Sequence, residues 1–407
     1  MKHARTRPRA APSDLVRAGV ALLGALALAA CDAGVGDDSP VTPLDAPVGV
    51  GSAQPSLASG DDGRVFLSWH EPTADSTSVL RMAVLDDTVW SEPVTVAAGR
   101  DFIVNWADFP SLLPLGGPRL AAHWLEREGS DTYAYGVRVS LSDDGGRTWT
   151  DPVTPHRDGT PTEHGFVAML PARDGVDVIW LDGRAYAGER QEMSLRAARV
   201  GVTGAGAEET LDERVCDCCQ TDAAVADSNA VVVYRDRSAG EIRDIAIQAR
   251  VRGRWSMPRV VHADGWKIDG CPVNGPAVAA HDNVVAVAWF TAANDTPRVQ
   301  LAFSRDGGAH FGLPFRIDEG QPGGRVDVVM LDERTAVVSW IEEGEPAGSV
   351  RLRTVSLDRG IGPARTIADV PAARASGFPR MVPAGAGVVI AWTDVDARRV
   401  RVARVAL

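Results

Sequence analysis

The chain has 407 residues, of which 45% are hydrophobic and 24% are charged, and its formal net charge is −12 at neutral pH. This composition excludes a disordered or collagen-like chain and allows a large buried core. The acidic excess also argues against a nucleic-acid partner, because neutralising phosphates requires a stripe of basic residues.

The amino terminus is typical of a targeting segment. Basic residues as far as Arg17 precede the apolar run 18–30, which is too short to cross a bilayer as a stable helix. The run ends in Leu28-Ala29-Ala30-Cys31, which resembles the bacterial lipobox, where the cysteine is lipidated and becomes the new amino terminus. We expect a lipoprotein signal peptide over residues 1–30 and a lipid on Cys31, with the protein anchored to a membrane of the cell envelope on its periplasmic or cell-surface side. The alternative is an ordinary secretory signal with a coincidental cysteine.

Residues 31–45 are acidic and small and include proline, as expected of a flexible tether. Beyond them, over residues 46–407, a short apolar run ending in an aromatic residue recurs seven times. The aromatic residues are Trp69, Trp124, Trp180, Tyr234, Trp289, Trp340 and Trp392, spaced by 51 to 56 residues. A period of this length indicates a propeller or another repeat array.

Each repeat contains short runs rich in valine and alanine, separated by Gly, Asp, Asn and Pro, which predict four β-strands. The sequence therefore predicts an all-β propeller of seven blades with four antiparallel strands each. Six blades is the alternative if the first or last repeat is irregular. The last repeat ends after its third strand, so we expect residues around Val48-Gly49-Val50 to supply the missing outer strand and close the ring.

Two repeats contain a similar hairpin between their third and fourth strands. Its residues are Ser142, Asp144, Gly146, Thr148 and Trp149 in the second repeat, and Ser304, Asp306 and Gly308 in the fifth. The first resembles at every position the Asp-box (BNR repeat) of sialidases and related propellers, and the second departs at its last two positions. The carboxylate can cap the backbone of the hairpin and the glycine can take a positive φ, so the box is structural. The resemblance thus implies a sialidase-like fold, but it does not identify active-site residues.

A sialidase needs an arginine cluster, an aspartic acid and a late tyrosine nucleophile assisted by a glutamate. The tyrosines here are Tyr133, Tyr135, Tyr186 and Tyr234, so the last three repeats contain none. Tyr234 takes the place of the repeat tryptophan and is expected to pack in its blade. Tyr186, with Glu189 near it in sequence, is the better placed candidate nucleophile, and the alternative is that it is an exposed aromatic residue of its loop.

In such propellers, the loops before each inner strand and the loops between the second and third strands share one face around the central channel. If the protein is a glycoside hydrolase, acid and base roles fall to Asp108, Asp182, Asp236 or Glu126, with Tyr186 as the nucleophile. The candidate ligand-binding residues are Asn105, His164, Arg184, Arg235, Arg237, Asn274, Arg325 and Arg374. Asp108, His164, Asn274 and Arg325 stand at equivalent points of four blades and are expected to converge.

Four cysteines, Cys216, Cys218, Cys219 and Cys271, fall on the loops before the inner strands of blades four and five. In an extracytoplasmic protein they predict two disulfides, one within the cluster and one between the blades. One alternative is a copper or zinc site of thiolates, with His164 as a further ligand, although Cys-x-Cys-Cys is not a standard zinc spacing. A free thiol is another alternative, and we expect no other cofactor.

These features predict a lipid-anchored, sialidase-like propeller that binds a glycan or a similar polar ligand at the channel mouth. The alternatives are a glycoside hydrolase of the sialidase type and a non-enzymatic scaffold or assembly lipoprotein.

The anchoring prediction is tested by Cys31→Ser. Acyl chains would supply the membrane affinity, so the variant is expected to move from the membrane fraction to the soluble fraction on cell fractionation. An unchanged membrane fraction would contradict a lipid on Cys31.

Overall fold

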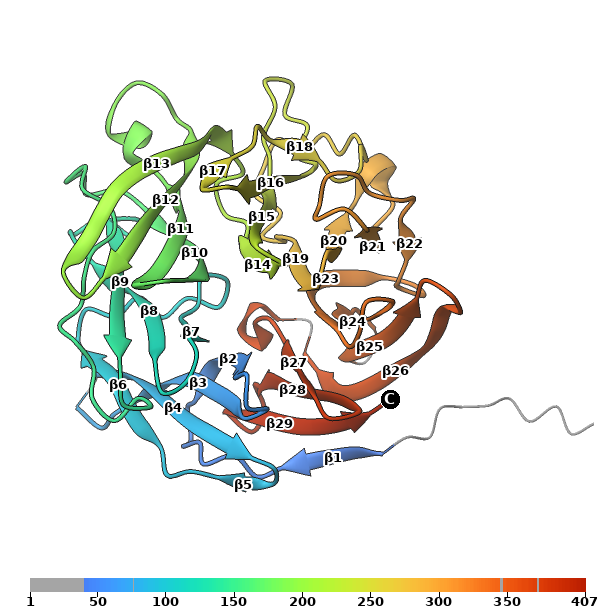
Figure 1. The fold of residues 1–407 in the computed structure, drawn as a ribbon, viewed down its shortest axis with the longest axis horizontal. Helices are drawn as coiled ribbons and strands as arrows, with labels where there is room; N and C mark the ends of the chain where they lie inside the picture. The colour runs from blue at the N-terminus through green and yellow to red at the C-terminus, as the bar shows by residue number, and fades with distance from the viewer. Residues whose placement is uncertain (1–39, 76, 345–346, 372) are drawn as a thin grey trace, which may run out of the picture. The chain divides into compact units, whose positions relative to one another are not determined.

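The computed structural model describes residues 40–407 except 76, 345–346 and 372. The predicted signal peptide, Cys31 and most of the predicted tether lie outside the described residues. Within them, seven antiparallel sheets are arranged around a central axis, so the seven-bladed propeller is confirmed (Figure 1).

The strands follow the chain blade by blade, from the axis outward. Blade 1 holds β2 (Ala53–Ser59), β3 (Val65–Pro72), β4 (Ser78–Asp86) and an outer strand split into β5 (Val89–Trp90) and β6 (Val94–Gly99). Blade 2 holds β7 (Ser111–Pro114), β8 (Leu120–Arg127) and β9 (Tyr135–Ser142), and blade 3 holds β10 (His164–Ala172), β11 (Gly175–Asp182), β12 (Met193–Gly201) and β13 (Gly204–Val215). Blade 4 holds β14 (Asp222–Ala226), β15 (Asn229–Arg235), β16 (Ile245–Val251), β17 (Arg254–Trp255) and β18 (Arg259–Val260).

The remaining blades follow the same plan. Blade 5 holds β19 (Ala277–His281), β20 (Val284–Thr291), β21 (Arg298–Ser304) and β22 (Phe315–Arg316), and blade 6 holds β23 (Pro322–Met330), β24 (Thr335–Glu342), β25 (Gly348–Ser356) and β26 (Gly360–Val370). Blade 7 holds β27 (Arg380–Ala384), β28 (Gly387–Asp394), β29 (Arg399–Ala406) and β1 (Val41–Leu44). Within residues 40–407, apart from the four positions left out, three short 3₁₀ helices lie in loops: η1 (Arg184–Ala187), η2 (Ala293–Asp295) and η3 (Arg374–Ser376).

Blade 2 departs from the four-stranded plan. Its outer strand is reduced to one bridge, in which Val139 and Val153 exchange two backbone hydrogen bonds of 2.8 and 2.9 Å. Proline at 152 and 155 surrounds this bridge, and proline lacks the amide that a longer ladder would need.

The core lies between neighbouring blades. Each sheet is covered on both faces, so the second strands are buried along almost their whole length instead of alternating inward and outward. The repeat tryptophans Trp69, Trp180, Trp289 and Trp340 are fully buried, and one apolar cluster joins residues of blades 5 and 6. This repeated packing explains the regular spacing of the aromatic residues in the sequence.

The ring closes through pairing of the two ends of the described chain. Strand β1 runs antiparallel to β29, with Val41 opposite Val405 and Leu44 opposite Val402 (Figure 1). The predicted closing segment, 48–50, was therefore wrong by several residues, and the last part of the predicted tether belongs to the propeller. The reason is geometric: β1 lies at the rim and β2 at the axis, so residues 45–52 must cross the width of a blade, roughly three strand spacings of 4.8 Å.

The two hairpins that resemble the Asp-box have the geometry that their residues predict. Asp144 Oδ1 accepts a hydrogen bond of 2.9 Å from the Thr148 amide, and Gly146 has a φ of +86°. In blade 5 the Asp306 carboxylate accepts from the His310 amide at 2.9 Å, and the His310 ring lies 2.7 Å from its other oxygen, in the place of the threonine hydroxyl. The incomplete second box thus folds like the first.

Among the described residues, no helix is both long enough and apolar enough to cross a membrane.

Ring closure is tested by two truncations, one beginning at residue 40 and one at residue 46. The shorter chain loses the β1 ladder and the partly buried Val41 and Leu44, so we expect thermal or urea denaturation to show it about 1–3 kcal/mol less stable. It also exposes the edge of β29 and should aggregate more readily. Equal stability of the two chains would contradict a closing role for β1.

Candidate functional site

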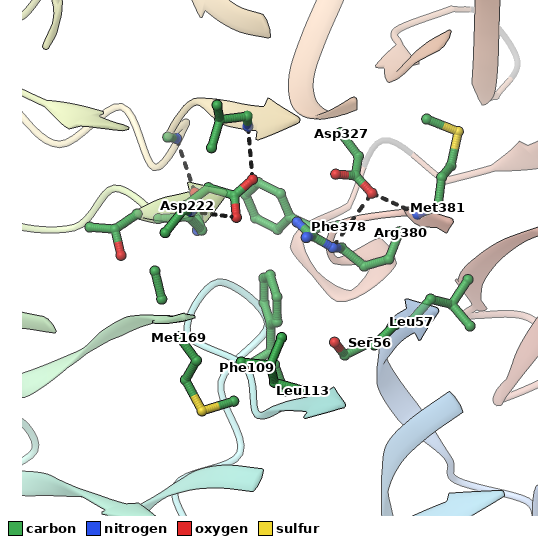
Figure 2. Close-up of a pocket in the computed structure, with 18 of the residues that line it drawn as sticks. Ser56, Leu57, Phe109, Leu113, Met169, Asp222, Asp327, Phe378, Arg380 and Met381 are labelled. Atoms are coloured by element: carbon green, nitrogen blue, oxygen red, sulfur yellow. Dashed lines mark hydrogen bonds and ion pairs between the residues drawn. The ribbon is translucent and has the colours of Figure 1, made fainter. Parts of the chain in front are cut away.

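Neighbouring strands within a blade are antiparallel. The loops before each inner strand and the loops between the second and third strands therefore lie at the same end of the blades. We call this end the mouth face. The inner strands β2, β7, β10, β14, β19, β23 and β27 enclose a central cavity of about 350 Å³ (Figure 2).

Buried carboxylates connect inner strands of adjacent blades around this cavity. Asp222 accepts a hydrogen bond of 2.8 Å from the Val278 amide, and Asp327 accepts one of 2.6 Å from the Met381 amide. Arg380 projects into the same space, with its Nε 3.6 Å from Asp327 (Figure 2). Burial, opposed by Arg380, raises the pKa of Asp327 to about 6. The cavity therefore holds charges that are tied to the fold.

Asp108 belongs to the same set of carboxylates. Its Oδ1 accepts a hydrogen bond of 2.7 Å from the amide of Phe166, where a bulge in β10 gives Phe166 a φ of +53°. A Cβ at Gly165 would clash with the other carboxylate oxygen, so a larger residue there would displace the Asp108 side chain. Asp108 is only 2% exposed, and its position is explained by the contact between blades 2 and 3.

Two aromatic side chains meet on the mouth face, from the loops before the inner strands of blades 2 and 7. Trp106 stacks on Phe378, with ring centroids 6.1 Å apart, and the Arg325 guanidinium lies 4.9 Å from the Trp106 ring. Arg325 also donates to the Ala373 carbonyl at 2.8 Å, and its amide donates to Asn274 Oδ1 at 2.7 Å. Asn274 and Arg325 thus meet as expected, but both are engaged within the protein.

A recurring contact accounts for two of the candidate catalytic acids. An acidic residue two positions after the blade tryptophan accepts a hydrogen bond from its indole: Glu71 at 2.9 Å, Glu126 at 2.7 Å, Asp182 at 2.8 Å and Glu342 at 2.6 Å. Residues i and i+2 of a strand point to the same face, which brings the two side chains together. Glu126 and Asp182 therefore have a structural role that four blades share.

His164 lies in a buried polar cluster of blade 3. Its Nε2 is 3.1 Å from Asp158 and its ring stacks on His156 at 3.9 Å. Burial alone would lower the pKa of His164, but the Asp158 and Asp182 carboxylates outweigh burial and raise it. Arg184 pairs with Asp182 at 2.6 Å and with Glu208 at 2.7 Å, which offsets part of the negative charge of the cluster.

The other candidate ligand-binding residues are mostly engaged in the fold. Arg235 is 2% exposed and donates to the carbonyls of Asn274 and Phe290, while the Asn105 side chain accepts from the Ala107 amide at 3.0 Å. Asp236 is half-buried, and burial raises its pKa to about 6. Arg374 lies exposed in η3.

A second group, between blades 3 and 4, reaches the surface of the mouth face. Asp217 accepts a hydrogen bond from Arg237 at 3.2 Å, and Tyr186, 37% exposed, interacts with both. Burial, together with the charge of Asp217, raises the pKa of Tyr186 to about 12 and that of the nearby Glu163 to about 7. We call Glu163, Tyr186, Asp217 and Arg237 the mouth cluster.

Tyr135 connects the mouth cluster to the buried carboxylates beneath it. Its hydroxyl lies 2.5 Å from Glu163 and 3.3 Å from Asp108, so one phenol contacts two carboxyl groups. Burial, opposed by the Phe166 amide and reinforced by the charge of Glu163, raises the pKa of Asp108 to about 8. Tyr135 and Glu163 were not among the predicted site residues, since they stand 28 positions apart and share no motif.

The cysteines form one of the two predicted disulfides. Cys218 and Cys271 are bonded and join the loops of blades 4 and 5. The predicted second disulfide, within the cluster, is not formed: Cys216 and Cys219 are free thiols whose Sγ atoms lie 2.9 Å apart. Their pairing could not be derived from sequence, because four cysteines allow three connectivities.

In the part of the chain that the structure describes, three groups of side chains have donor atoms close enough to hold a metal ion. They are Cys216 with Cys218 and Cys219, Glu128 with His156 and His164, and Asp158 with His164 and Asp182. In the two histidine groups, His156 Nε2 accepts from the Val137 amide at 3.2 Å and His164 is hydrogen-bonded through both ring nitrogens. In the cysteine group, Cys218 is bonded to Cys271, which leaves two thiols.

Comparison with known proteins identifies the fold alone. No protein-family model and no curated protein matches the chain. An ulvan lyase bound to a -[GlcA(1-4)Rha3S]- segment has a TM-score of 0.54 at 10% identity, over 90% of this chain and 94% of that one. An α-L-arabinanase from Penicillium chrysogenum complexed with arabinobiose has a TM-score of 0.50 at 13% identity, over 90% and 98%. NanB sialidase from Streptococcus pneumoniae has a TM-score of 0.42 at 12% identity, over 88% and 67%.

The raised pKa of Asp108 predicts a pH-dependent stability. The folded protein holds a proton on Asp108 that the unfolded chain, with an ordinary pKa of 3.8, releases. The stability from this proton is complete below about pH 4 and is lost as the pH rises toward 8. Between pH 5 and pH 9, wild type should lose roughly 2–5 kcal/mol more than Asp108→Asn in urea denaturation. Parallel stability profiles of the two proteins would contradict a protonated Asp108.

Proposed function

We propose that the protein binds a neutral carbohydrate, or a similar hydroxyl-rich ligand, at the mouth cluster. The observation that carries this proposal is the group of partly exposed polar side chains around Tyr186. One of the group, Glu163, is held from beneath by the buried Tyr135, which also contacts Asp108. Carboxyl groups with perturbed pKa values are candidates for a functional site, and Asp108, which lies beneath Glu163, lines the central cavity.

The chemistry of the mouth cluster suits sugar hydroxyls. Asp217 and Glu163 offer acceptors, Arg237 offers donors in a fixed plane, and the Tyr186 ring offers an apolar face with a hydroxyl at its edge. A sugar ring has the same combination of apolar faces and polar edges, so one ligand can satisfy all four side chains.

A neutral sugar fits better than an anionic one. The arginines expected to orient an anionic sugar are Arg235, Arg325 and Arg374. Arg235 and Arg325 donate to backbone carbonyls. Arg374 is exposed, but it lies in η3 next to blade 7 and is not part of the mouth cluster. Only Arg237 belongs to the mouth cluster, and it faces two acidic partners, Asp217 and Glu241.

Binding is also favoured over glycoside hydrolysis. A hydrolase needs two carboxyl groups with the substrate between them. Here the hydroxyl of Tyr135 contacts both Asp108 and Glu163 and takes up the space between them. Tyr186, whose pKa is raised to about 12, is poorly suited as a nucleophile. We therefore expect no turnover of simple sialosides.

The amino-terminal sequence supports a proposal for where in the cell the protein acts. We propose that a lipid on Cys31 holds the propeller at the cell envelope, where glycans and their fragments are encountered. The ulvan lyase and the arabinanase with the same fold were each described with a bound sugar, which is an analogy and not the basis of the proposal.

The binding proposal is tested on a glycan array followed by isothermal titration calorimetry. Tyr186→Ala and Arg237→Gln should each weaken binding of the best oligosaccharide about tenfold or more, because each removes a contact of roughly 1.5–3 kcal/mol.

The matched control is Glu333→Gln, which changes an exposed acid in the turn between β23 and β24 at the opposite end of the blade and should leave the affinity unchanged. Three results would contradict the proposal: no oligosaccharide bound by wild type, as a pure scaffold protein would give; equal affinity of the mouth-cluster variants; or sialoside hydrolysis that Tyr186→Phe abolishes.

A further inference from the structure

Two pairs of cysteines lie next to each other on the mouth face. The disulfide between Cys218 and Cys271 reaches the surface, where Cys271 is exposed. Behind it, Cys216 and Cys219 are each 1% exposed, and their Sγ atoms are 2.9 Å apart. The sulfur atoms of Cys216, Cys218 and Cys219 all lie within 4.8 Å of one another.

We propose that these four cysteines form a thiol–disulfide exchange centre, in which the buried Cys216/Cys219 dithiol reduces an external small disulfide through the exposed Cys218–Cys271 bond. The spacing Cys216-Asp217-Cys218-Cys219 places the two thiols three residues apart, as in other Cys-x-x-Cys redox pairs. By exchange with the exposed disulfide, the buried pair can react with a disulfide in solution.

The surroundings distinguish the two thiols. Burial alone would raise the pKa of Cys216, but the hydrogen bond from Cys219 and the guanidinium groups of Arg235 and Arg243 outweigh burial and lower it to about 6. Arg243 Nη1 lies 3.4 Å from Cys216 Sγ and is oriented by Glu241. Burial raises the pKa of Cys219. Cys216 is therefore the nucleophile, and Cys219 retains its proton until a later step.

The exchange balances in four steps. Cys216 thiolate attacks Cys218 Sγ, which forms a Cys216–Cys218 bond and releases Cys271 thiolate. That thiolate attacks the external disulfide, forming a mixed disulfide and releasing one thiol. Cys219 then attacks Cys216, which closes the Cys216–Cys219 disulfide and frees Cys218. Finally, Cys218 attacks Cys271, restores the first disulfide and releases the second thiol, so the protons of Cys216 and Cys219 end on the two released thiols.

The test uses the full chain carrying Cys31→Ser, with oxidised glutathione as the external disulfide. As prepared, the folded protein should contain two thiols that are titratable after denaturation, and incubation with oxidised glutathione should remove both. Cleavage on the amino side of aspartates places Cys216, the Cys218/Cys219 pair and Cys271 on three different peptides. Before oxidation only the last two peptides are joined, through Cys218–Cys271. The new Cys216–Cys219 bond is therefore seen as attachment of the Cys216 peptide to this pair, which lasts until reduction.

Two variants test the route. In Cys219→Ser the sequence stops after the second step, so glutathione should stay attached to Cys271, as read by mass spectrometry. In the double variant Cys218→Ser/Cys271→Ser the route is removed, and oxidation of the buried pair should be at least tenfold slower. Thermal unfolding checks that both variants are folded.

Several results would overturn the proposal. They are thiols that resist oxidised glutathione in the folded protein, glutathione attached to Cys216 instead of Cys271 in Cys219→Ser, and copper or zinc bound in a one-to-one ratio by the cysteines as prepared. A Cys216–Cys219 bond already complete in protein prepared without oxidant, and resistant to a small dithiol reductant, would also overturn it, because the bond would then be a structural disulfide.

Discussion

The structure depends on closing seven twisted sheets into one ring. An open row of blades would leave an inner sheet face and a strand edge exposed at each end, whereas the ring covers every face with a neighbour. The pairing of β1 with β29 makes this closure by linking segments more than 350 residues apart in the described chain. Hydrogen bonds across the same joint support it, since Ser52 accepts from the Val400 amide and Arg399 donates to the Val48 carbonyl.

Closure also fixes the positions of the inner strands, and these strands position the loops of the mouth face. Asp108, Asp222 and Asp327 each accept a hydrogen bond from a backbone amide of the next blade. The same kind of hydrogen bond therefore connects three pairs of neighbouring blades around the channel. Because Asp108 also contacts Tyr135, the packing of blades 2 and 3 reaches the mouth cluster through a short chain of hydrogen bonds. A polar site on such a base is preorganised, since its side chains lose little freedom when a ligand binds.

The fold could be predicted from sequence because it repeats. Seven aromatic residues at nearly constant spacing identify seven blades, and the Asp-box residues specify their own hairpin through local contacts such as that of Asp144 with Thr148. The site was less predictable. The acid two residues after a blade tryptophan is visible in the repeat, as in Trp124 and Glu126, and its recurrence could have marked it as structural from the sequence alone.

Other parts of the site needed three-dimensional information. Tyr135 and Glu163 belong to different blades and carry no common spacing, so their contact depends on how blades 2 and 3 pack. The closing strand was misplaced because the width that the chain must cross between rim and axis leaves no mark in the sequence. The cysteine pairing likewise follows from loop positions and not from the order of the residues.

Hydrogen–deuterium exchange with and without a mixture of neutral oligosaccharides tests most directly that the mouth cluster between blades 3 and 4 is the binding surface. The account predicts slower exchange of amides in the loops 183–192, 216–221 and 236–241, and unchanged exchange in the turns between first and second strands. Protection confined to those turns, or to the Asp-box hairpins, would contradict it.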